Sequence, residues 1–216
     1  MEKPEKAKKI LDVLEGEFPD AATALEFSNP LELLISTILS AQATDKLVNK
    51  VAKDLFKKYR TAEDYASTPL DELEEDLSSV NFYRNKAKSV KNCTTKLVED
   101  FGGEVPGNLD DMVKLPGVGR KTANVVLGNA FNLPALAVDT HVKRVAGRLG
   151  LTDQTDPDKI EADLTSFIPE DRWTLTTHVL ILHGRKTCKS RKPLCEECPV
   201  SRWCDYYKEV VKGRGG

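Results

Sequence analysis

The sequence predicts an all-α protein of about ten helices, and three observations carry that prediction. Apolar residues recur at three- and four-residue spacing along most of the 216-residue chain. Caps and breakers such as Asn29-Pro30, Gly102-Gly103 and Asp156-Pro157 separate the helical segments. No alternating run of apolar and polar residues is long enough for a convincing strand.

The predicted helices follow from these signals in chain order. The first places Ile10, Leu11 and Leu14 on one face, and Asn29 caps the second. Thr44 or Asp45 caps the third. The expected helices, with approximate ends, are residues 5–15, 30–41, 45–56, 69–78, 84–101, 110–114, 120–131, 140–149, 157–167 and 170–184. The glycine-rich end at 213–216 is expected to be a flexible tail.

Composition excludes several classes of protein. The chain is 40% hydrophobic and 31% charged, as an ordinary globular protein is. It contains no apolar run long enough for a membrane span and no signal-peptide core, so we expect a cytoplasmic protein. The net charge of −2 does not indicate a nucleic-acid binder, but residues 185–192 contain five bases and no acid. A polyanion would therefore have to bind a local basic patch.

The stretch Leu115-Pro116-Gly117-Val118-Gly119-Arg120-Lys121 is typical of a helix-hairpin-helix. Gly117 and Gly119 allow a backbone path that a side chain would block, and they leave room for a close approach. The amides of the following helix suit an anion such as a phosphate. Lys121 lies just inside that helix, at the positive end of the helix dipole and beside Arg120. Both positive charges favour the neutral, nucleophilic form of its amine.

Four cysteines near the carboxyl end predict a metal centre. Cys188, Cys195, Cys198 and Cys204 have the spacing C-x6-C-x2-C-x5-C. Structural zinc usually uses two C-x2-C pairs, whereas only one is present here, so a [4Fe-4S] cluster fits better. Zinc and unligated thiols stay open as alternatives. Cys93 falls at an inward helix position and is expected to be a core thiol.

The loop between the first two cysteines carries Lys189, Arg191 and Lys192. A metal centre would fix this loop, and the three cations would then contact phosphates. The alternative is an ordinary solvated charged loop. His178 and His183 are five residues apart on one helix, off the spacing of a ligand pair, and are expected to be structural.

The hairpin, the segment Val138-Asp139-Thr140-His141 and the cysteine tail together resemble the endonuclease III family of base-excision DNA glycosylases. The stretch Leu39-Ser40-Ala41-Gln42-Ala43-Thr44-Asp45 resembles that family's early motif. The likeness runs from about Ala7 to Trp203 and includes four separate motifs in the same order. It implies an enzyme that removes oxidised pyrimidines from double-stranded DNA and then cleaves the abasic strand by β-elimination.

The resemblance implies two catalytic residues. Lys121 matches the nucleophile that attacks C1′ and forms a Schiff base, and burial is expected to help lower its pKa. Asp139, eighteen positions later, matches the aspartate that stabilises developing positive charge and carries a proton. The alternatives are a phosphate-binding role for Lys121 and an N-cap role for Asp139.

Three further residues match DNA contacts of the family. Gln42 corresponds to the residue that fills the gap left by the flipped base; otherwise it is an exposed amide at a helix end. Phe82 corresponds to the intercalating wedge, although that position is aliphatic in better-known members, and a buried core Phe is equally compatible. Asn81 stands where glycine is common. His141, close to Asp139, is expected to contact a base edge.

The resemblance also predicts two helical lobes flanking a DNA-binding cleft. Residues 22–132 would form one lobe with the hairpin, and residues 1–21 and 133–216 the other, with the cluster loop at 188–204. We expect a monomer that associates with the nucleoid through duplex DNA carrying an oxidised pyrimidine or an abasic site. The alternatives are a monofunctional mismatch glycosylase of the same fold and a non-catalytic DNA-binding module, neither of which needs the Lys121–Asp139 pair.

Overall fold

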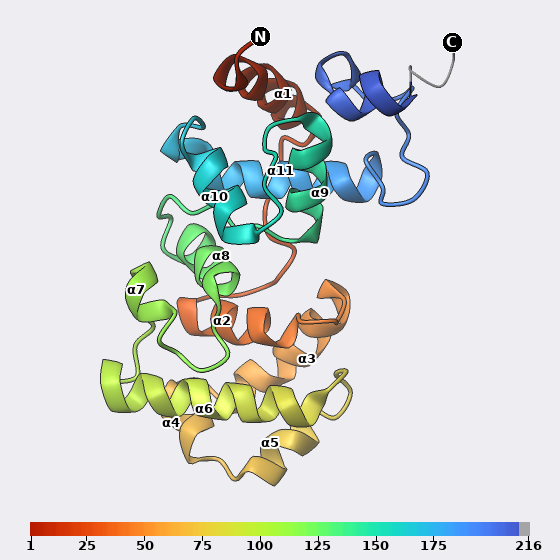
Figure 1. Ribbon diagram of the computed structural model, residues 1–216. Helices are drawn as coiled ribbons and strands as arrows, with labels where there is room; N and C mark the ends of the chain where they lie inside the picture. The colour runs from red at the N-terminus through yellow and green to blue at the C-terminus, as the bar shows by residue number, and fades with distance from the viewer. Residues whose placement is uncertain (212–216) are drawn as a thin grey trace. The chain divides into compact units, whose positions relative to one another are not determined.

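The computed structural model describes residues 1–211, and within this range helices are the only regular secondary structure, without a strand (Figure 1). The predicted all-α class is confirmed. The glycine-rich end at 213–216, expected to be a flexible tail, lies outside the described residues. None of the described helices is long and apolar enough to cross a membrane.

The chain divides into two compact units, one of residues 23–133 and one of residues 1–22 with 134–216. The first unit contains α2 (Pro30–Leu39), α3 (Asp45–Lys58), α4 (Ala62–Ser67), α5 (Leu70–Asp76), α6 (Tyr83–Phe101), α7 (Leu109–Met112) and α8 (Arg120–Ala130). The second contains α1 (Lys3–Glu17), α9 (Thr140–Leu149), α10 (Pro157–Thr165), η1 (Glu170–Arg172), α11 (Trp173–Lys186), η2 (Ser201–Trp203) and η3 (Tyr207–Val211).

Side-chain caps begin several of the helices, among them α2, α3, α9 and α10. Asn29 accepts a hydrogen bond from the amide of Glu32 at 3.0 Å, and Thr44 accepts one from Leu47 at 3.3 Å. Asp156 caps α10 in the same way. Each of these caps satisfies an amide that has no partner inside its helix. The sequence signals for these starts are thus confirmed.

The helix α4 was not predicted from the sequence. This helix has six residues and a capping box, in which Thr61 accepts from the amide of Asp64 and the Asp64 carboxylate accepts from the amide of Thr61. Only Ala62 and Tyr65 are buried along it. Six residues are too few to establish a helical apolar period, so the capping box was the one available signal.

The unit of residues 23–133 has a core in which α2 is central. Leu33, Leu34, Ile35 and Leu39 are all fully buried. The helix packs against α3, α6 and α8, while α6 also packs against α4 and α5. Because α2 supplies an apolar residue to every side, its carboxyl end and the starts of α6 and α8 are held in fixed positions.

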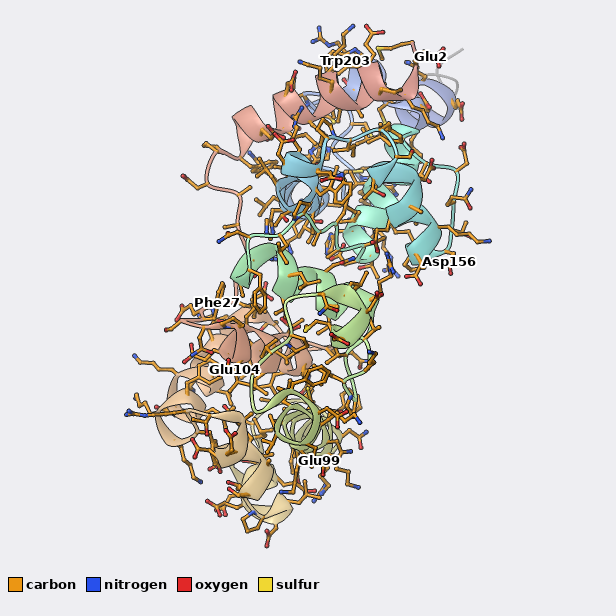
Figure 2. All side chains as sticks on the ribbon, turned by 90° about the vertical axis from the view of Figure 1, so that its left-hand side faces the viewer. Glu2, Phe27, Glu99, Glu104, Asp156 and Trp203 are labelled. Carbon is orange, nitrogen blue, oxygen red and sulfur yellow. The ribbon has the colours of Figure 1, made fainter. Side chains whose placement is uncertain are left out.

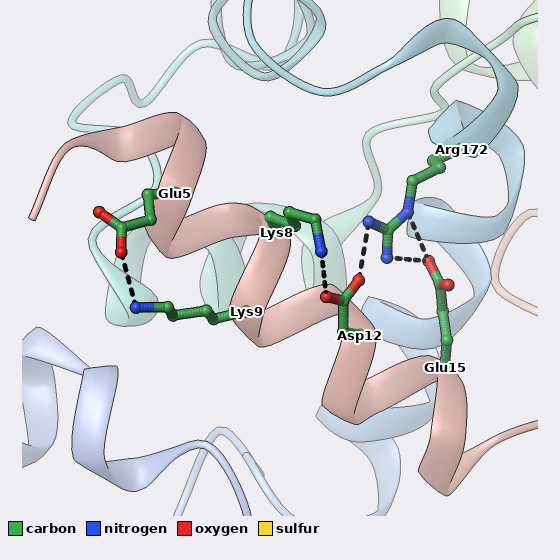
Figure 3. A network of polar contacts seen from close by, with 6 residues as sticks. All are labelled: Glu5, Lys8, Lys9, Asp12, Glu15 and Arg172. Atoms are coloured by element: carbon green, nitrogen blue, oxygen red, sulfur yellow. Dashed lines mark hydrogen bonds and ion pairs between the residues drawn. The ribbon is translucent and has the colours of Figure 1, made fainter.

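In the other unit, α1 and α9 both pack on α11 around one core (Figure 1). Arg172 joins α11 to α1 by binding Asp12 at 3.0 Å and Glu15 at 2.7 Å (Figure 3). At the other end of α1, the buried amine of Lys6 pairs with Asp205 at 2.7 Å. This pair holds the segment around Cys204, including Trp203, beside the first turns of α1 (Figure 2).

Candidate functional site

The hairpin between α7 and α8 is anchored by two buried side chains. Leu115 and Val118 are 2% and 5% exposed, and the amide of Val118 donates to the carbonyl of Leu115 at 3.1 Å. Gly117 has φ +78°, and a Cβ there would lie 3.3 Å from the Cβ of Ser89 on α6. The turn therefore needs glycine at 117, both for its backbone conformation and for its close packing on α6.

Gly119 differs from Gly117 in both respects. Its φ is −86°, and a Cβ built on it would have no neighbour within 4 Å. The fold itself therefore does not require glycine at this position. A glycine here keeps the surface in front of the turn open to a close approach from outside.

The amino end of α8 follows directly and has no side-chain cap. A helix start without a side-chain cap is a common binding position for an anion. Arg120 and Lys121 occupy the first two helical positions, and both side chains are exposed. The expected burial of Lys121 is therefore wrong, because position 121 faces outward from the first turn of α8.

Gln42 and Phe82 both have left-handed backbone conformations, with φ values of 55° and 58°. Gln42 lies beyond the carboxyl end of α2, and Phe82 immediately precedes α6. The Phe82 side chain is 62% exposed, which excludes the core alternative for this residue. The side-chain amide of Asn81 donates to the carbonyl of Gln42 at 3.3 Å, so the two turns are joined.

An open pocket lies between these turns and the hairpin. Its wall contains Lys86, which sequence analysis did not single out. Lys86 lies in the first turn of α6, where a lysine is usually exposed. Here the residue is only 6% exposed. No sequence signal distinguishes it from its neighbours Arg84 and Lys88.

Asp139 and His141 lie at the start of α9. The carboxylate of Asp139 accepts a hydrogen bond from the amide of Val142 at 2.8 Å, so Asp139 is the N-cap of α9. His141 Nδ1 lies 3.1 Å from the Arg144 guanidinium. Because arginine only donates, Nδ1 accepts and the ring is neutral. Burial lowers the pKa of His141, and the Arg144 charge acts in the same direction while Asp139 opposes it.

Arg144 also binds two backbone carbonyls, those of Gly184 at 3.0 Å and Cys188 at 3.1 Å. A Cβ at Gly184 would lie 3.0 Å from both Arg144 and His141, so a side chain there would disturb this contact. The first turns of α9 are thus fixed to the loop that begins after α11.

Cys188, Cys195, Cys198 and Cys204 line one apolar cavity of about 310 Å³. All four are free thiols. Burial raises the pKa of Cys198 to about 11 and raises the pKa of Cys195 and Cys204 as well. Four soft donors around one cavity match the ligand set of an iron–sulfur cluster, whose iron ions favour the thiolate form.

The spread of the donors separates a cluster from zinc. Within residues 1–211, no three His, Cys, Asp or Glu side chains are close enough to surround one metal ion. Thiolates bound to a single zinc at ~2.3 Å would lie about 3.8 Å apart. A cube-shaped cluster binds each thiolate at a different iron and needs a wider arrangement. The four cysteines therefore fit a [4Fe-4S] cluster better than zinc.

Two residues beside the cysteines were not predicted as neighbours of the centre. His183 Nε2 lies 3.6 Å from the sulfur of Cys198, although sequence analysis expected only a structural histidine. The Arg148 guanidinium lies 3.5 Å from the sulfur of Cys188, and the Arg148 carbonyl accepts from the Cys204 thiol at 3.2 Å. Arg148 thereby contacts both ends of the four-cysteine segment.

Arg148 also shapes the basic loop. It donates to the carbonyls of Lys189 at 2.7 Å and Ser190 at 3.0 Å. The side chains of Lys189, Arg191 and Lys192 are all exposed, and Lys192 has φ +50°. The loop therefore has a fixed backbone and presents three cations to solvent.

Comparison with known proteins agrees with this geometry. Residues 35–170 match the HhH-GPD superfamily of base excision DNA repair proteins, and residues 188–204 match the iron–sulfur binding domain of endonuclease III. Endonuclease III of Bacillus subtilis is 50% identical over 195 residues, covering 90% of this chain and 89% of the relative. Endonuclease III of Synechocystis is 47% identical over 203 residues, covering 94% and 93%.

Solved structures give the same result. A non-covalent endonuclease III–DNA complex and a trapped covalent endonuclease III–DNA intermediate each superpose with a TM-score of 0.91 at 46% identity, covering 98% of this chain and all of the other. A thermostable thymine-DNA glycosylase superposes with a TM-score of 0.86 at 26% identity, covering 95% and 98%. Members of the endonuclease III family are bifunctional DNA glycosylases and AP lyases with a [4Fe-4S] cluster. The chain therefore belongs to the endonuclease III family, within the HhH-GPD base excision repair superfamily.

Proposed function

We propose that this protein acts as a monomer on double-stranded DNA, removes oxidised pyrimidines and cleaves the resulting abasic strand, with Lys121 as nucleophile and Asp139 as its carboxylate partner. The observation that carries the proposal is the position of Lys121. It follows the hairpin turn and stands on the first turn of a helix that has no side-chain cap, which is a position that suits a phosphate. A phosphate bound there would bring a sugar carbon within reach of the amine.

The proposed chemistry begins at the sugar. The neutral amine of Lys121 forms a bond to C1′ as the bond between C1′ and the base breaks, and the base leaves with the electron pair. The nitrogen gives a proton to Asp139, which passes it to O4′ as the C1′–O4′ bond opens, and the nitrogen lone pair completes a Schiff base. A proton then leaves C2′ to water, its electron pair forms the C2′–C3′ double bond, and the C3′–O bond breaks to release the 3′-phosphate, which is the β-elimination step.

We further propose that the two lobes, residues 22–132 and residues 1–21 with 133–216, place Lys121 and Asp139 on opposite sides of one DNA-binding cleft. Gln42 and Phe82 would occupy the gap that the flipped nucleotide leaves. Their exposure and their joined turns support that role, because a side chain that enters the base stack must project from a fixed backbone.

The remaining contacts fall on both lobes. Gly117, Gly119 and Arg120 would hold the strand backbone, and His141, with a neutral ring, would accept or donate at a base edge. Lys189, Arg191 and Lys192 would bind phosphates farther along the duplex, from a loop that Arg148 and the cysteines hold in place.

Borohydride trapping tests the assignment of the nucleophile. The wild-type protein should form a covalent adduct with duplexes carrying thymine glycol or an abasic site, and Lys121→Gln should form none. Lys114→Gln serves as the matched control, because Lys114 lies on the same hairpin and only pairs with Asp111. An adduct that survives in Lys121→Gln would refute the assignment, and a wild-type protein that excises the base without any adduct would be a monofunctional glycosylase.

A further inference from the structure

The pocket between Gln42, Phe82 and the hairpin has one charged group in its wall. The carboxyl end of α2, the first turns of α6 and the hairpin turn with Thr122 form its lining. Lys86 is the only titratable residue among them, and no carboxylate faces its amine from any of these three elements. We name this hollow the α6 pocket.

The amine of Lys86 is buried and has no hydrogen-bond partner. An ammonium group removed from water without a partner is costly, and proteins seldom retain one without a function. Burial is also the cause that lowers the pKa of Lys86. A ligand with a negative charge or a strong hydrogen-bond acceptor would therefore stabilise the buried ammonium group of Lys86.

The start of α6 lies at the same place. Phe82 occupies the N-cap position of this 19-residue helix and supplies no capping hydrogen bond. Lys86 belongs to the first turn of α6, and Asn85 beside it also lines the pocket. An uncapped helix start and an unpartnered amine together form a site for an anion rather than for a neutral base edge.

The neighbours of the pocket indicate which anion. Its rim contains Gln42 and Phe82 on one side and Gly117 on the other. Gly117 packs against Ser89, which lies three residues after Lys86 and on the same face of α6. A DNA strand running from the hairpin to the exposed Phe82 side chain would pass over the amine.

We propose that Lys86 binds one phosphodiester of the DNA, the phosphate located between the hairpin contact and the Phe82 wedge. The inference rests on the proposed function only in that this face contacts duplex DNA. It adds a binding residue, and it explains why a buried, unpartnered cation is kept beside the wedge. In the free protein the site carries a cost that DNA binding removes.

Fluorescence anisotropy tests the contact with a duplex that contains a tetrahydrofuran abasic analogue. Lys86→Met, which keeps an unbranched side chain one atom shorter and removes the charge, should weaken binding about tenfold and reduce the slope of log K against log salt concentration by about 0.9. The loss should be the same whichever base stands opposite the analogue. Lys88→Met, two residues along and exposed, is the control and should change the affinity far less.

A set of duplexes with single methylphosphonate substitutions then locates the phosphate. Neutralising one particular phosphate should weaken binding by the wild-type protein and leave binding by Lys86→Met unchanged, since each change removes the same interaction. An unchanged salt slope in Lys86→Met, or a loss that depends on the opposite base, would overturn the phosphate assignment. If the wild-type protein bound none of the duplexes, the proposed function itself would fail.

Thermal stability separates this proposal from a structural role. Lys86→Met should raise the melting temperature of the free protein by about 2–4 °C at pH 7, because it removes a buried charge. Burial makes the pKa of Lys86 lower in the folded protein than in the unfolded chain, where it is 10.5. Between these two pKa values the folded amine is neutral while the unfolded one is still charged, so the wild-type protein becomes more stable as the pH rises through this range. The difference between variant and wild type should therefore shrink between pH 7 and pH 10. A lower melting temperature for Lys86→Met would show that the amine supports the fold.

Discussion

At the scale of single residues, backbone strain coincides with the proposed DNA contacts. Four residues other than glycine have positive φ among residues 1–211: Gln42, Phe82, Asn132 and Lys192. A bulky side chain such as that of Phe82 is rare in this conformation, which costs about 1–2 kcal/mol. Strain of this kind persists where surrounding contacts hold it, and it is concentrated at functional sites. Three of the four are residues for which we propose a DNA contact.

Phe82 offers a test of that relation. Phe82→Gly should stabilise the free protein by about 1 kcal/mol, because glycine adopts the left-handed conformation without strain and the exposed ring contributes little packing. The same change should reduce excision of thymine glycol at least about tenfold, since no side chain would fill the unstacked step. Urea unfolding and single-turnover excision measure the two effects.

Phe82→Leu is the matched control for this experiment. It keeps an apolar wedge in the same strained backbone, so we expect excision close to the wild-type rate and no gain in stability. Full activity in Phe82→Gly would show that Phe82 is not the wedge.

At the scale of elements, the caps decide which helix ends are available to a ligand. The starts of α2, α3, α9 and α10 are capped by Asn29, Thr44, Asp139 and Asp156. Among the described helices, α1, α5, α6, α8 and α11 begin without a side-chain cap. Of these, the starts of α6 and α8 lie beside the α6 pocket and at the hairpin, where we propose that phosphates bind. A DNA phosphate would there take the place of the missing cap.

Asp139 combines a cap with a proposed catalytic role, and two substitutions separate them. Asparagine caps a helix about as well as aspartate, so Asp139→Asn should retain the wild-type stability. Asp139→Ala removes the hydrogen bond from Val142 and should cost about 1 kcal/mol. Both variants should lose glycosylase activity, because neither has a carboxylate.

Chemical unfolding and excision kinetics on the same preparations measure both properties. Asp156→Ala is the control, since it removes the corresponding cap from α10 and should cost similar stability without loss of excision. An active Asp139→Asn protein would leave Asp139 with the capping role alone.

At the scale of the whole molecule, the four-cysteine segment has little apolar core of its own. Of its residues, Val200 and Cys204 are buried in the core that α1, α9 and α11 share. The rest is held by Arg144, by Arg148 and by the pair of Lys6 with Asp205. A cluster bound by Cys188, Cys195, Cys198 and Cys204 would therefore supply much of the cohesion of residues 187–207.

Removal of the cluster should accordingly loosen one unit more than the other. In a Cys198→Ala variant, hydrogen exchange should increase in residues 187–207, in α9 and in α1. Exchange in the unit of residues 23–133 should stay near its wild-type rate, because its core contains no cysteine ligand. Cys93→Ala, in the core of that unit, is the converse control. Equal loosening of both units in Cys198→Ala would contradict this prediction.

Local sequence determined the helical fold, most helix starts and the chemistry of the site. Caps such as Asn29 and Asp139 act within four residues, and the cysteine spacing and the hairpin stretch are likewise local patterns. Such signals can be read without the fold because the interactions they report are between near neighbours in the chain.

Only the tertiary structure decided which side chains are exposed and which are buried. Phe82 faces solvent, whereas Lys86 is enclosed by residues of α2 and the hairpin that lie tens of positions away in the chain. Arg148 and His183 lie beside the cysteine sulfurs for the same reason. Burial depends on contacts between distant segments, and a lysine in the first turn of a helix gives no local indication that another helix will cover it.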